Sequence, residues 1–192
     1  MAKLYFNYSS MNAGKSTLLL QAAYNYRERG MNTLLMIAAF DDRAGKGRIA
    51  SRIGLSADAD VFNSADNVFN HIKTAHERKK VDAVLVDEAQ FLTETQVWQL
   101  ANVADELRVP VMCFGLRTDF QGKLFPGSAA LLALADNLKE IKTICWCGRK
   151  ATMVARLDAD GRIVEEGDQV VIGGNDKYVS LCRRHWSDRN LG

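Results

Sequence analysis

Residues 9–16 read Ser9-Ser10-Met11-Asn12-Ala13-Gly14-Lys15-Ser16 and come close to the phosphate-binding pattern G-x-x-x-x-G-K-[S/T], with a serine in place of the first glycine. They follow an apolar run at residues 3–8 and precede an amphipathic segment from Lys15 to about Arg29. In such a strand–loop–helix the backbone N–H groups and the helix N-terminus bind phosphate, the lysine reaches the outer phosphates, and the serine hydroxyl ligates Mg²⁺. A chance Gly-Lys-Ser at the start of a helix is the alternative interpretation.

A second stretch, AVLVDEAQ at residues 83–90, favours the phosphate-binding interpretation. Asp87 ends an apolar strand, where P-loop proteins place an aspartate that holds Mg²⁺, often through water. Glu88 follows, and its chemistry is open. It can activate water in an NTPase, accept the proton of a substrate hydroxyl in a kinase, or form a structural ion pair. Together the two stretches predict a site for nucleotide phosphates.

The spacing of apolar runs and helical patterns predicts an open α/β sheet. The strand candidates are nearly continuous apolar runs, as expected for parallel strands covered on both faces. Helical patterns separate them, and Thr93 to Gln96 reads as a capping box. The strands are expected at 3–8, 33–40, 81–87 and 109–116, and the helices at 15–29, 62–78, 94–107 and 128–139. This alternation is typical of α/β folds.

After about Lys142 the chain becomes rich in glycine and charge, with no long helical pattern. We therefore expect a core domain at residues 1–142 and a small second domain at residues 143–192. The second domain contains Cys145, Cys147, Cys182 and His185, a Cys₃His set suited to tetrahedral structural Zn²⁺. Such an ion would stabilise a unit whose own core is small. Free thiols clustered by chance are the alternative.

Composition limits the partners. Among the 192 residues, 25 are basic and 23 are acidic, and the net charge of +2 gives no support to broad binding of nucleic acid or anionic membrane. The apolar fraction of 47% is enough for a core. No apolar run approaches the ~20 residues of a membrane span, and the first ten residues lack the pattern of a signal peptide. A cytoplasmic location is therefore expected.

Beyond these patterns, the chain resembles the type II thymidine kinases of bacteria and animals over nearly its whole length. The resemblance rests on the phosphate loop and on DEAQF, GLRTDFQGKLF, CWCGRKATMVAR and IGGNDKYVSLCR, in that order. Bacterial members also have a serine at the position of Ser9. The resemblance implies a P-loop, RecA-like open parallel sheet with a small C-terminal zinc-binding domain that carries a substrate-covering lasso. It also implies an ATP-dependent phosphotransferase that acts on the 5′-hydroxyl of thymidine or deoxyuridine.

The resemblance also assigns residues. Glu88 would be the general base, and Cys145, Cys147, Cys182 and His185 the zinc ligands, although the one-residue gap in Cys145-x-Cys147 departs from animal members. ATP and Mg²⁺ would be bound by Ser9, Ser10, Met11, Asn12, Ala13, Gly14, Lys15, Ser16, Asp87, Glu88, Ala89 and Gln90. The nucleoside would be bound by Met11, Phe91, Leu116, Phe120, Gln169, Val170, Val171, Ile172, Gly173 and Tyr178. A homotetramer inhibited by thymidine triphosphate is implied as well.

One residue and two other functions complete the expectations. We hypothesise that Arg117, at the end of the strand that carries Leu116, neutralises charge during phosphoryl transfer; a structural ion pair is the alternative. DEAQ also resembles helicase motifs, so an ATP-driven nucleic-acid-binding ATPase is the alternative function. A single core without a second lobe does not form the usual helicase cleft. A nucleotide-gated zinc protein without catalysis would leave Glu88 unexplained.

Overall fold

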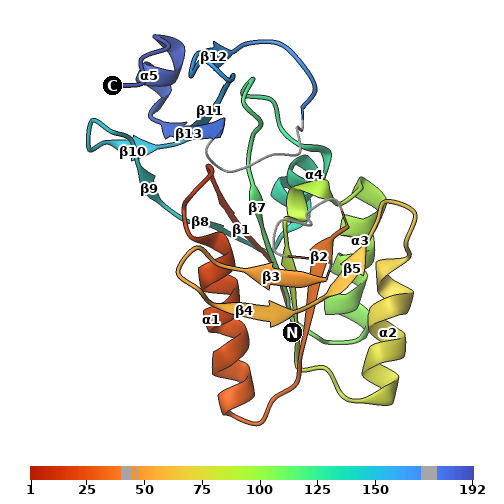
Figure 1. Cartoon of the computed structure of the whole chain (residues 1–192). Helices are drawn as coiled ribbons and strands as arrows, with labels where there is room; N and C mark the ends of the chain where they lie inside the picture. Colours follow the sequence, from red (N-terminus) through yellow and green to blue (C-terminus); the bar gives the residue numbers. More distant parts are fainter. Residues whose placement is uncertain (40–44, 46, 170–176) are drawn as a thin grey trace.

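The computed structural model describes residues 1–39, 45, 47–169 and 177–192. Its centre is a six-stranded, wholly parallel sheet with the strand order β5-β2-β6-β7-β1-β8 (Figure 1). These strands are β1 Leu4–Ser9, β2 Thr33–Ala38, β5 Asp60–Phe62, β6 Ala83–Asp87, β7 Val111–Leu116 and β8 Asn137–Glu140. One strand, β7, separates β1 from β6, as in RecA-like folds. The predicted open α/β sheet is confirmed.

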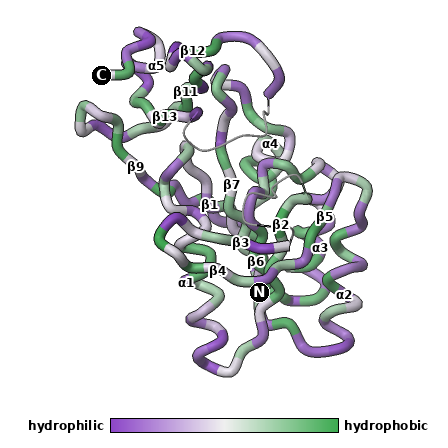
Figure 2. Tube along the Cα trace, viewed as in Figure 1, coloured by the Kyte–Doolittle hydropathy of each residue, from purple (hydrophilic) through white to green (hydrophobic). Residues whose placement is uncertain are grey.

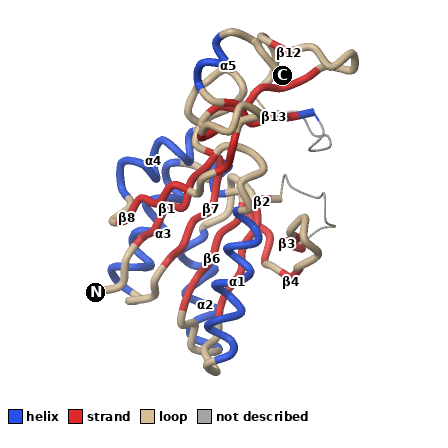
Figure 3. Tube along the Cα trace, turned by 90° about the vertical axis from the view of Figure 1, so that its left-hand side faces the viewer, coloured by secondary structure: helices blue, strands red, loops and turns tan. Residues whose placement is uncertain are grey.

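Helices cover both faces of this sheet (Figure 3). They are α1 Lys15–Glu28, α2 Val68–Arg78, the 3₁₀ turn η1 Ala89–Phe91, α3 Glu94–Glu106 and α4 Pro126–Leu134. Helices α2, α3 and α4 share one hydrophobic cluster with residues such as Phe6 and Val86. Helix α1 packs on the other face with Leu35 and Leu85. Successive strand residues therefore point to opposite cores, which explains the nearly continuous apolar runs.

The central strands and the outer helical turns differ in hydropathy. Figure 2 shows hydrophobic stretches along the central strands and hydrophilic stretches on the outer turns of α1 and α2. A short antiparallel pair, β3 Arg48–Ala50 with β4 Ser56–Asp58, lies beside α1 and adds Ile49 to the second cluster. Among the described residues, no helix combines the length and the apolar character that crossing a membrane requires.

The C-terminal segment forms a small lobe at the carboxyl end of the sheet (Figure 1). Its described residues form two small antiparallel sheets and one short helix. The elements are β9 Thr143–Ile144, β10 Lys150–Ala151, β11 Met153–Leu157, β12 Ile163–Val164, β13 Tyr178–Leu181 and α5 Arg183–Ser187. The large sheet ends at Glu140 and the lobe begins at Thr143, next to the expected division after residue 142, which remains a prediction.

Two expected helices differ from the structure. The segment 62–78 is a helix only from Val68, because Phe62 ends strand β5 and Asn67 caps α2 by accepting a hydrogen bond from the Asn70 N–H. The helix expected to end at Lys139 ends at Leu134. Residues 137–140 instead form edge strand β8 beside β1, with the Asp136 carboxylate accepting a hydrogen bond from the Leu4 N–H. Pairing with the sheet outweighed local helix propensity there.

Candidate active site

The phosphate loop joins β1 to α1 as the sequence predicts. Gly14 has a left-handed φ of 82°, and its carbonyl accepts the first helical hydrogen bond, from the Leu18 N–H. A side chain at Gly14 would meet nothing within 4 Å, so the backbone conformation, and not space, favours glycine there. The loop and the first turn of α1 therefore present backbone N–H groups at the carboxyl edge of the sheet, where α/β folds bind phosphate.

Ser9, at the position of the usual first glycine, takes part in the site. It is buried, its hydroxyl donates to the Ser10 carbonyl at 2.6 Å, and it accepts a hydrogen bond from the Lys15 ammonium at 3.3 Å. The ammonium also lies 3.5 Å from the Ser10 carbonyl. The lysine is thus held inside the loop by oxygens that a phosphate can replace.

Asp87 meets the phosphate loop directly. Its carboxylate accepts a hydrogen bond of 2.7 Å from the Ser16 hydroxyl, although the two residues are 71 positions apart. Burial, and then the charge of Glu88, raise the pKa of the Asp87 carboxyl to about 7. A serine hydroxyl and a carboxylate at this distance form a hard oxygen pair, the ligand type that Mg²⁺ prefers.

Glu88 is placed by an unusual backbone and a buried amide. It has a left-handed φ of 52° and directly precedes η1. The Gln90 side-chain amide donates to the Glu88 carboxylate at 2.5 Å and accepts from the Leu116 N–H at 3.0 Å. A Cβ at Gly115 would lie only 3.0 Å from Gln90 atoms, so close packing fixes the amide as well. Glu88 is therefore held by β7, the strand between the two motif strands.

The predicted nucleoside residues lie around the same edge. Leu116 ends β7, Phe91 ends η1 and packs edge-on against Phe125 at 5.9 Å, and Met11 lies in the phosphate loop. The Met11 carbonyl accepts a hydrogen bond of 2.5 Å from the Ser180 hydroxyl of β13, the strand that begins at Tyr178. Phe120 and Gln169 flank the buried Asp119, whose carboxylate accepts from the Gln169 side-chain amide at 2.9 Å. The predicted positions 170–173 lie outside the described residues.

Arg117 points toward the C-terminal lobe. Its guanidinium donates to the Thr152 carbonyl at 3.0 Å, and its N–H donates to the Ser9 carbonyl at 3.0 Å. These contacts tie the lobe to β1. The hypothesised part of Arg117 in phosphoryl transfer remains a prediction.

The Cys/His set predicted from the sequence is assembled in the lobe. The ligand atoms of Cys145, Cys147, Cys182 and His185 all lie within 4.8 Å of one another, so they can hold one metal ion. Burial acts to raise the pKa of the Cys145 thiol, but hydrogen bonds at Cys147, Cys182 and His185 outweigh it and hold that pKa at about 6. A thiolate, which metals require, is therefore favoured there. The His185 ring also stacks on Trp146, with centroids 4.4 Å apart.

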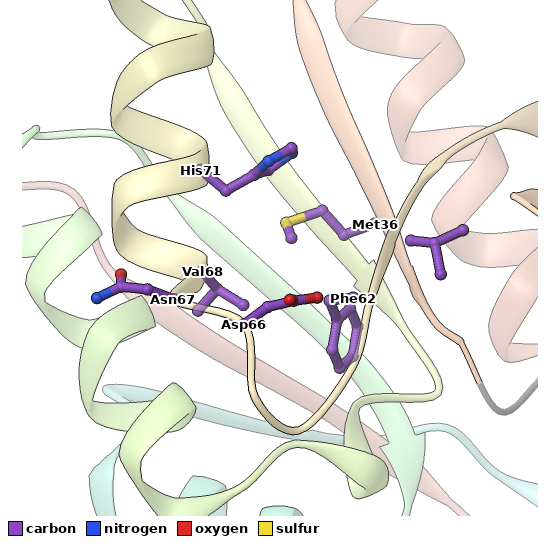
Figure 4. A pocket seen from close by; sticks show the side chains of 7 residues that line it. Met36, Phe62, Asp66, Asn67, Val68 and His71 are labelled. Carbon is purple, nitrogen blue, oxygen red and sulfur yellow. The ribbon is translucent and has the colours of Figure 1, made fainter.

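A cavity of about 160 Å³ lies between β5 and the start of α2 (Figure 4). It is lined by Met36, Val61, Phe62, Asp66, Asn67, Val68 and His71. His71 is exposed and pairs with Asp60 at 2.7 Å. His76 is partly buried, and its ring accepts a hydrogen bond from the Val81 N–H. None of the predicted site residues lines this cavity.

Two residues with many contacts were not among the predictions, Arg156 and Asp119. Arg156 is 6% exposed within β11, and Asp119 is 4% exposed in the β7–α4 connection. A charged residue inside the apolar run MVARL was the available signal for Arg156. Nothing in the sequence connected it with Phe120 or Gln169.

The fold and the phosphate site define a P-loop nucleotide-binding protein of the RecA-like type. Residues 2–186 match the family described as thymidine kinase. The chain therefore belongs to the thymidine kinase family. The kinase prediction is thereby confirmed, and the ATP-driven nucleic-acid-binding alternative has no better support.

Relatives agree over nearly full length. A thymidine kinase from Agrobacterium fabrum is 66% identical over 97% of this chain and 96% of its own. A thymidine kinase from Ruegeria pomeroyi is 67% identical over 98% of this chain and 95% of its own. A thymidine kinase from Haemophilus influenzae is 59% identical over 98% of both chains.

Solved structures with lower similarity include Pif1 helicase from Candida albicans. It has a TM-score of 0.41 at 16% identity, over 74% of this chain and 36% of the helicase. A DNA replication initiation factor has a TM-score of 0.40 at 17% identity, over 73% of this chain and 40% of the factor. The chain thus spans about two fifths of the length of these two proteins.

Proposed function

We propose that the chain transfers the γ-phosphate of ATP to the 5′-hydroxyl of thymidine or deoxyuridine, with Glu88 as the general base. The observation that carries this proposal is the meeting of the Ser16 hydroxyl with the Asp87 carboxylate at 2.7 Å, directly before Glu88. It joins the triphosphate-binding loop and a candidate base at one edge. Family membership supports the choice of substrate.

In the proposed reaction the loop from Ser9 to Ser16 holds the phosphates, and Lys15 exchanges its contacts with Ser9 and Ser10 for phosphate oxygens. Ser16 and Asp87 would hold Mg²⁺, which when bound neutralises charge on the phosphates. Glu88 takes the proton of the 5′-hydroxyl while the hydroxyl oxygen forms a bond to the γ-phosphorus. The bond from that phosphorus to the β–γ bridging oxygen breaks, and ADP leaves. The Gln90 amide holds the Glu88 carboxylate during this step.

Further parts of the proposal rest on the donor set and on the family. The three sulfurs and one imidazole nitrogen of the lobe suit structural Zn²⁺ better than Mg²⁺ or Ca²⁺, which prefer oxygen. We also propose a homotetramer, inhibition by thymidine triphosphate, and a cytoplasmic location. Sizing with light scattering tests the oligomer, and inhibition kinetics tests the triphosphate.

The reaction is tested with labelled ATP, a panel of nucleosides and single-stranded DNA. We expect label in thymidine and deoxyuridine 5′-monophosphates, and little DNA-stimulated release of phosphate. Phosphate release driven by DNA, without nucleoside phosphorylation, would refute the proposal.

The role of Glu88 is tested by Glu88→Gln, which keeps the shape of the side chain but removes the base. We expect kcat to fall by at least ~100-fold, because general-base catalysis contributes about that much, while the Kd for ATP stays within about threefold. Turnover like that of the wild type would remove Glu88 from the mechanism.

A further inference from the structure

Arg156 is a buried cation on β11 whose contacts are not those of an ion pair. Its guanidinium carbon lies 3.8 Å from the centre of the Phe120 ring. One terminal nitrogen donates to the Asp168 carbonyl at 2.7 Å and the other to the Glu166 carbonyl at 3.4 Å. In the described part of the chain, no carboxylate lies within salt-bridge distance of it.

Three separate stretches of chain meet at Arg156, two of them at its guanidinium and the third through strand pairing. Phe120 comes from the connection between β7 and α4, and Glu166 to Asp168 lead directly to Gln169. The third stretch is β13, where Tyr178 is the antiparallel partner of Arg156. Directly opposed side chains in such a pair lie on one face of the sheet with Cβ atoms ~5 Å apart. Each stretch contains a residue predicted to bind the nucleoside: Phe120, Gln169 or Tyr178.

The backbone around Arg156 is adapted to this contact. Gly167 has a φ of +130°, and a Cβ there would lie 2.6 Å from a guanidinium nitrogen of Arg156. Two further hydrogen bonds join the same stretches, from the Gln121 side-chain amide to the Glu165 carbonyl at 3.0 Å and from Gln169 to Asp119 at 2.9 Å. Arg156 is the residue that connects all three stretches, by stacking on Phe120, by donating to the Asp168 carbonyl and by strand pairing with Tyr178.

We propose that Arg156 is a positioning residue that sets the affinity for the nucleoside by holding Phe120, Tyr178 and the stem of residues 166–169 in one arrangement. The planar guanidinium group suits this task, because it can stack on a ring while it donates to two carbonyls. A lysine ammonium cannot reproduce both contacts. The proposal rests on the proposed function. It predicts an effect on thymidine that is not shared by ATP.

The test compares Arg156→Met, which keeps the length and apolar stem of the side chain, with Arg162→Met, an exposed position of the same lobe. We expect Arg156→Met to raise the KM and the Kd for thymidine about tenfold, the size of one lost charged hydrogen bond. The KM for ATP should stay within about twofold. Arg162→Met should change neither, and Arg156→Lys should behave like Arg156→Met.

The proposal is overturned if Arg156→Met leaves the KM for thymidine within about twofold of the wild type, or raises both KM values equally. Should this variant fail to fold, Gly167→Ala gives the second test, since it displaces the guanidinium without changing any charge. It should raise the KM for thymidine selectively, and an unchanged KM overturns the proposal. A wild-type chain that does not phosphorylate thymidine refutes the proposed function instead.

Discussion

Asp87 shows how burial changes the acidity of a single carboxyl group at the proposed magnesium site. It is 2% exposed, and burial with the neighbouring Glu88 charge raises its pKa from 3.8 to about 7. A magnesium ion bound there, as proposed, would favour the ionised carboxylate, so the proton and the metal would compete for the same oxygens. The metal-free protein therefore carries a carboxylate that is unfavourable to ionise.

This raised pKa predicts a pH dependence of stability. Between 3.8 and about 7 the folded state holds the Asp87 proton more tightly than the unfolded state, so the free energy of unfolding falls as pH rises through that window. The full loss, at most about 4 kcal/mol, is reached above the folded pKa. The Asp87→Asn variant has no carboxyl group to ionise at this position, so its free energy of unfolding does not show this loss.

Urea unfolding without magnesium, from about pH 5.5 to about pH 8, measures the difference between Asp87→Asn and the wild type. We expect the advantage of the variant to grow with pH and then level off. Titration of the cysteine and histidine ligands acts on both proteins and cancels in the difference. A difference that does not change with pH would contradict the buried, raised carboxyl.

At the scale of elements, α4 is packed unusually closely against η1, the turn that directly follows the candidate base Glu88. A Cβ at Gly127 would lie 2.6, 2.7 and 2.9 Å from the carbonyl oxygens of Ala89, Leu92 and Gln90. The neighbouring Ser128 hydroxyl donates to the Leu116 carbonyl. The start of α4 thus fixes both η1 and the end of β7.

Gly127→Ala separates helix propensity from packing. Propensity alone would stabilise α4 by ~1 kcal/mol, but the clash with three backbone oxygens is expected to cost about 1–3 kcal/mol and to lower kcat by shifting Glu88. Chemical denaturation and steady-state kinetics provide the measurements. Ala129→Gly, at an exposed position of the same helix, should lose up to ~1 kcal/mol with unchanged kcat. A stabilised, fully active Gly127→Ala would show that α4 moves freely.

How far the sequence predicted these elements depended on the range of the interactions. The capping box of α3 is local, and both of its hydrogen bonds between Thr93 and Gln96 are present. The meeting of Ser16 with Asp87 followed from a motif pair whose strands end at the same edge. Strand β8 was not predicted, because its partner β1 lies more than a hundred residues away. The contacts of Arg156 with Glu166, Asp168 and Phe120 join residues closer in the sequence, and they were missed because no motif links these residues.

At the scale of the whole molecule, the proposed metal site is the feature expected to stabilise the C-terminal lobe. Its ligands come from the β9–β10 turn and from the start of α5, so one ion would join both ends of the lobe. The local core is small, containing Cys145, Ala151, Ala155, Leu181 and Cys182 as buried members. Without the ion, little apolar burial remains to hold these ends together.

Removal of the metal is therefore expected to unfold the lobe while the parallel sheet persists. A strong chelator, or Cys182→Ala, should lower the melting temperature and abolish phosphorylation, since structural zinc contributes several kcal/mol. Calorimetry, circular dichroism and metal analysis check this. An apoprotein with unchanged melting and full activity would contradict the structural role, and Cys113→Ala, which alters a buried cysteine in β7, serves as the control.

The lobe touches the phosphate loop itself, through Ser10 with Ala151 at 3.4 Å and Ser180 with Met11 at 2.5 Å. A ligand that shifts one of these partners shifts the other. Thermodynamic reciprocity then demands that whichever substrate arrives first alters the dissociation constant of the second by the same factor as in the opposite order. The two hydroxyl groups thus offer a route by which the binding of a pyrimidine at the lobe and of a triphosphate at the loop would influence each other without direct contact.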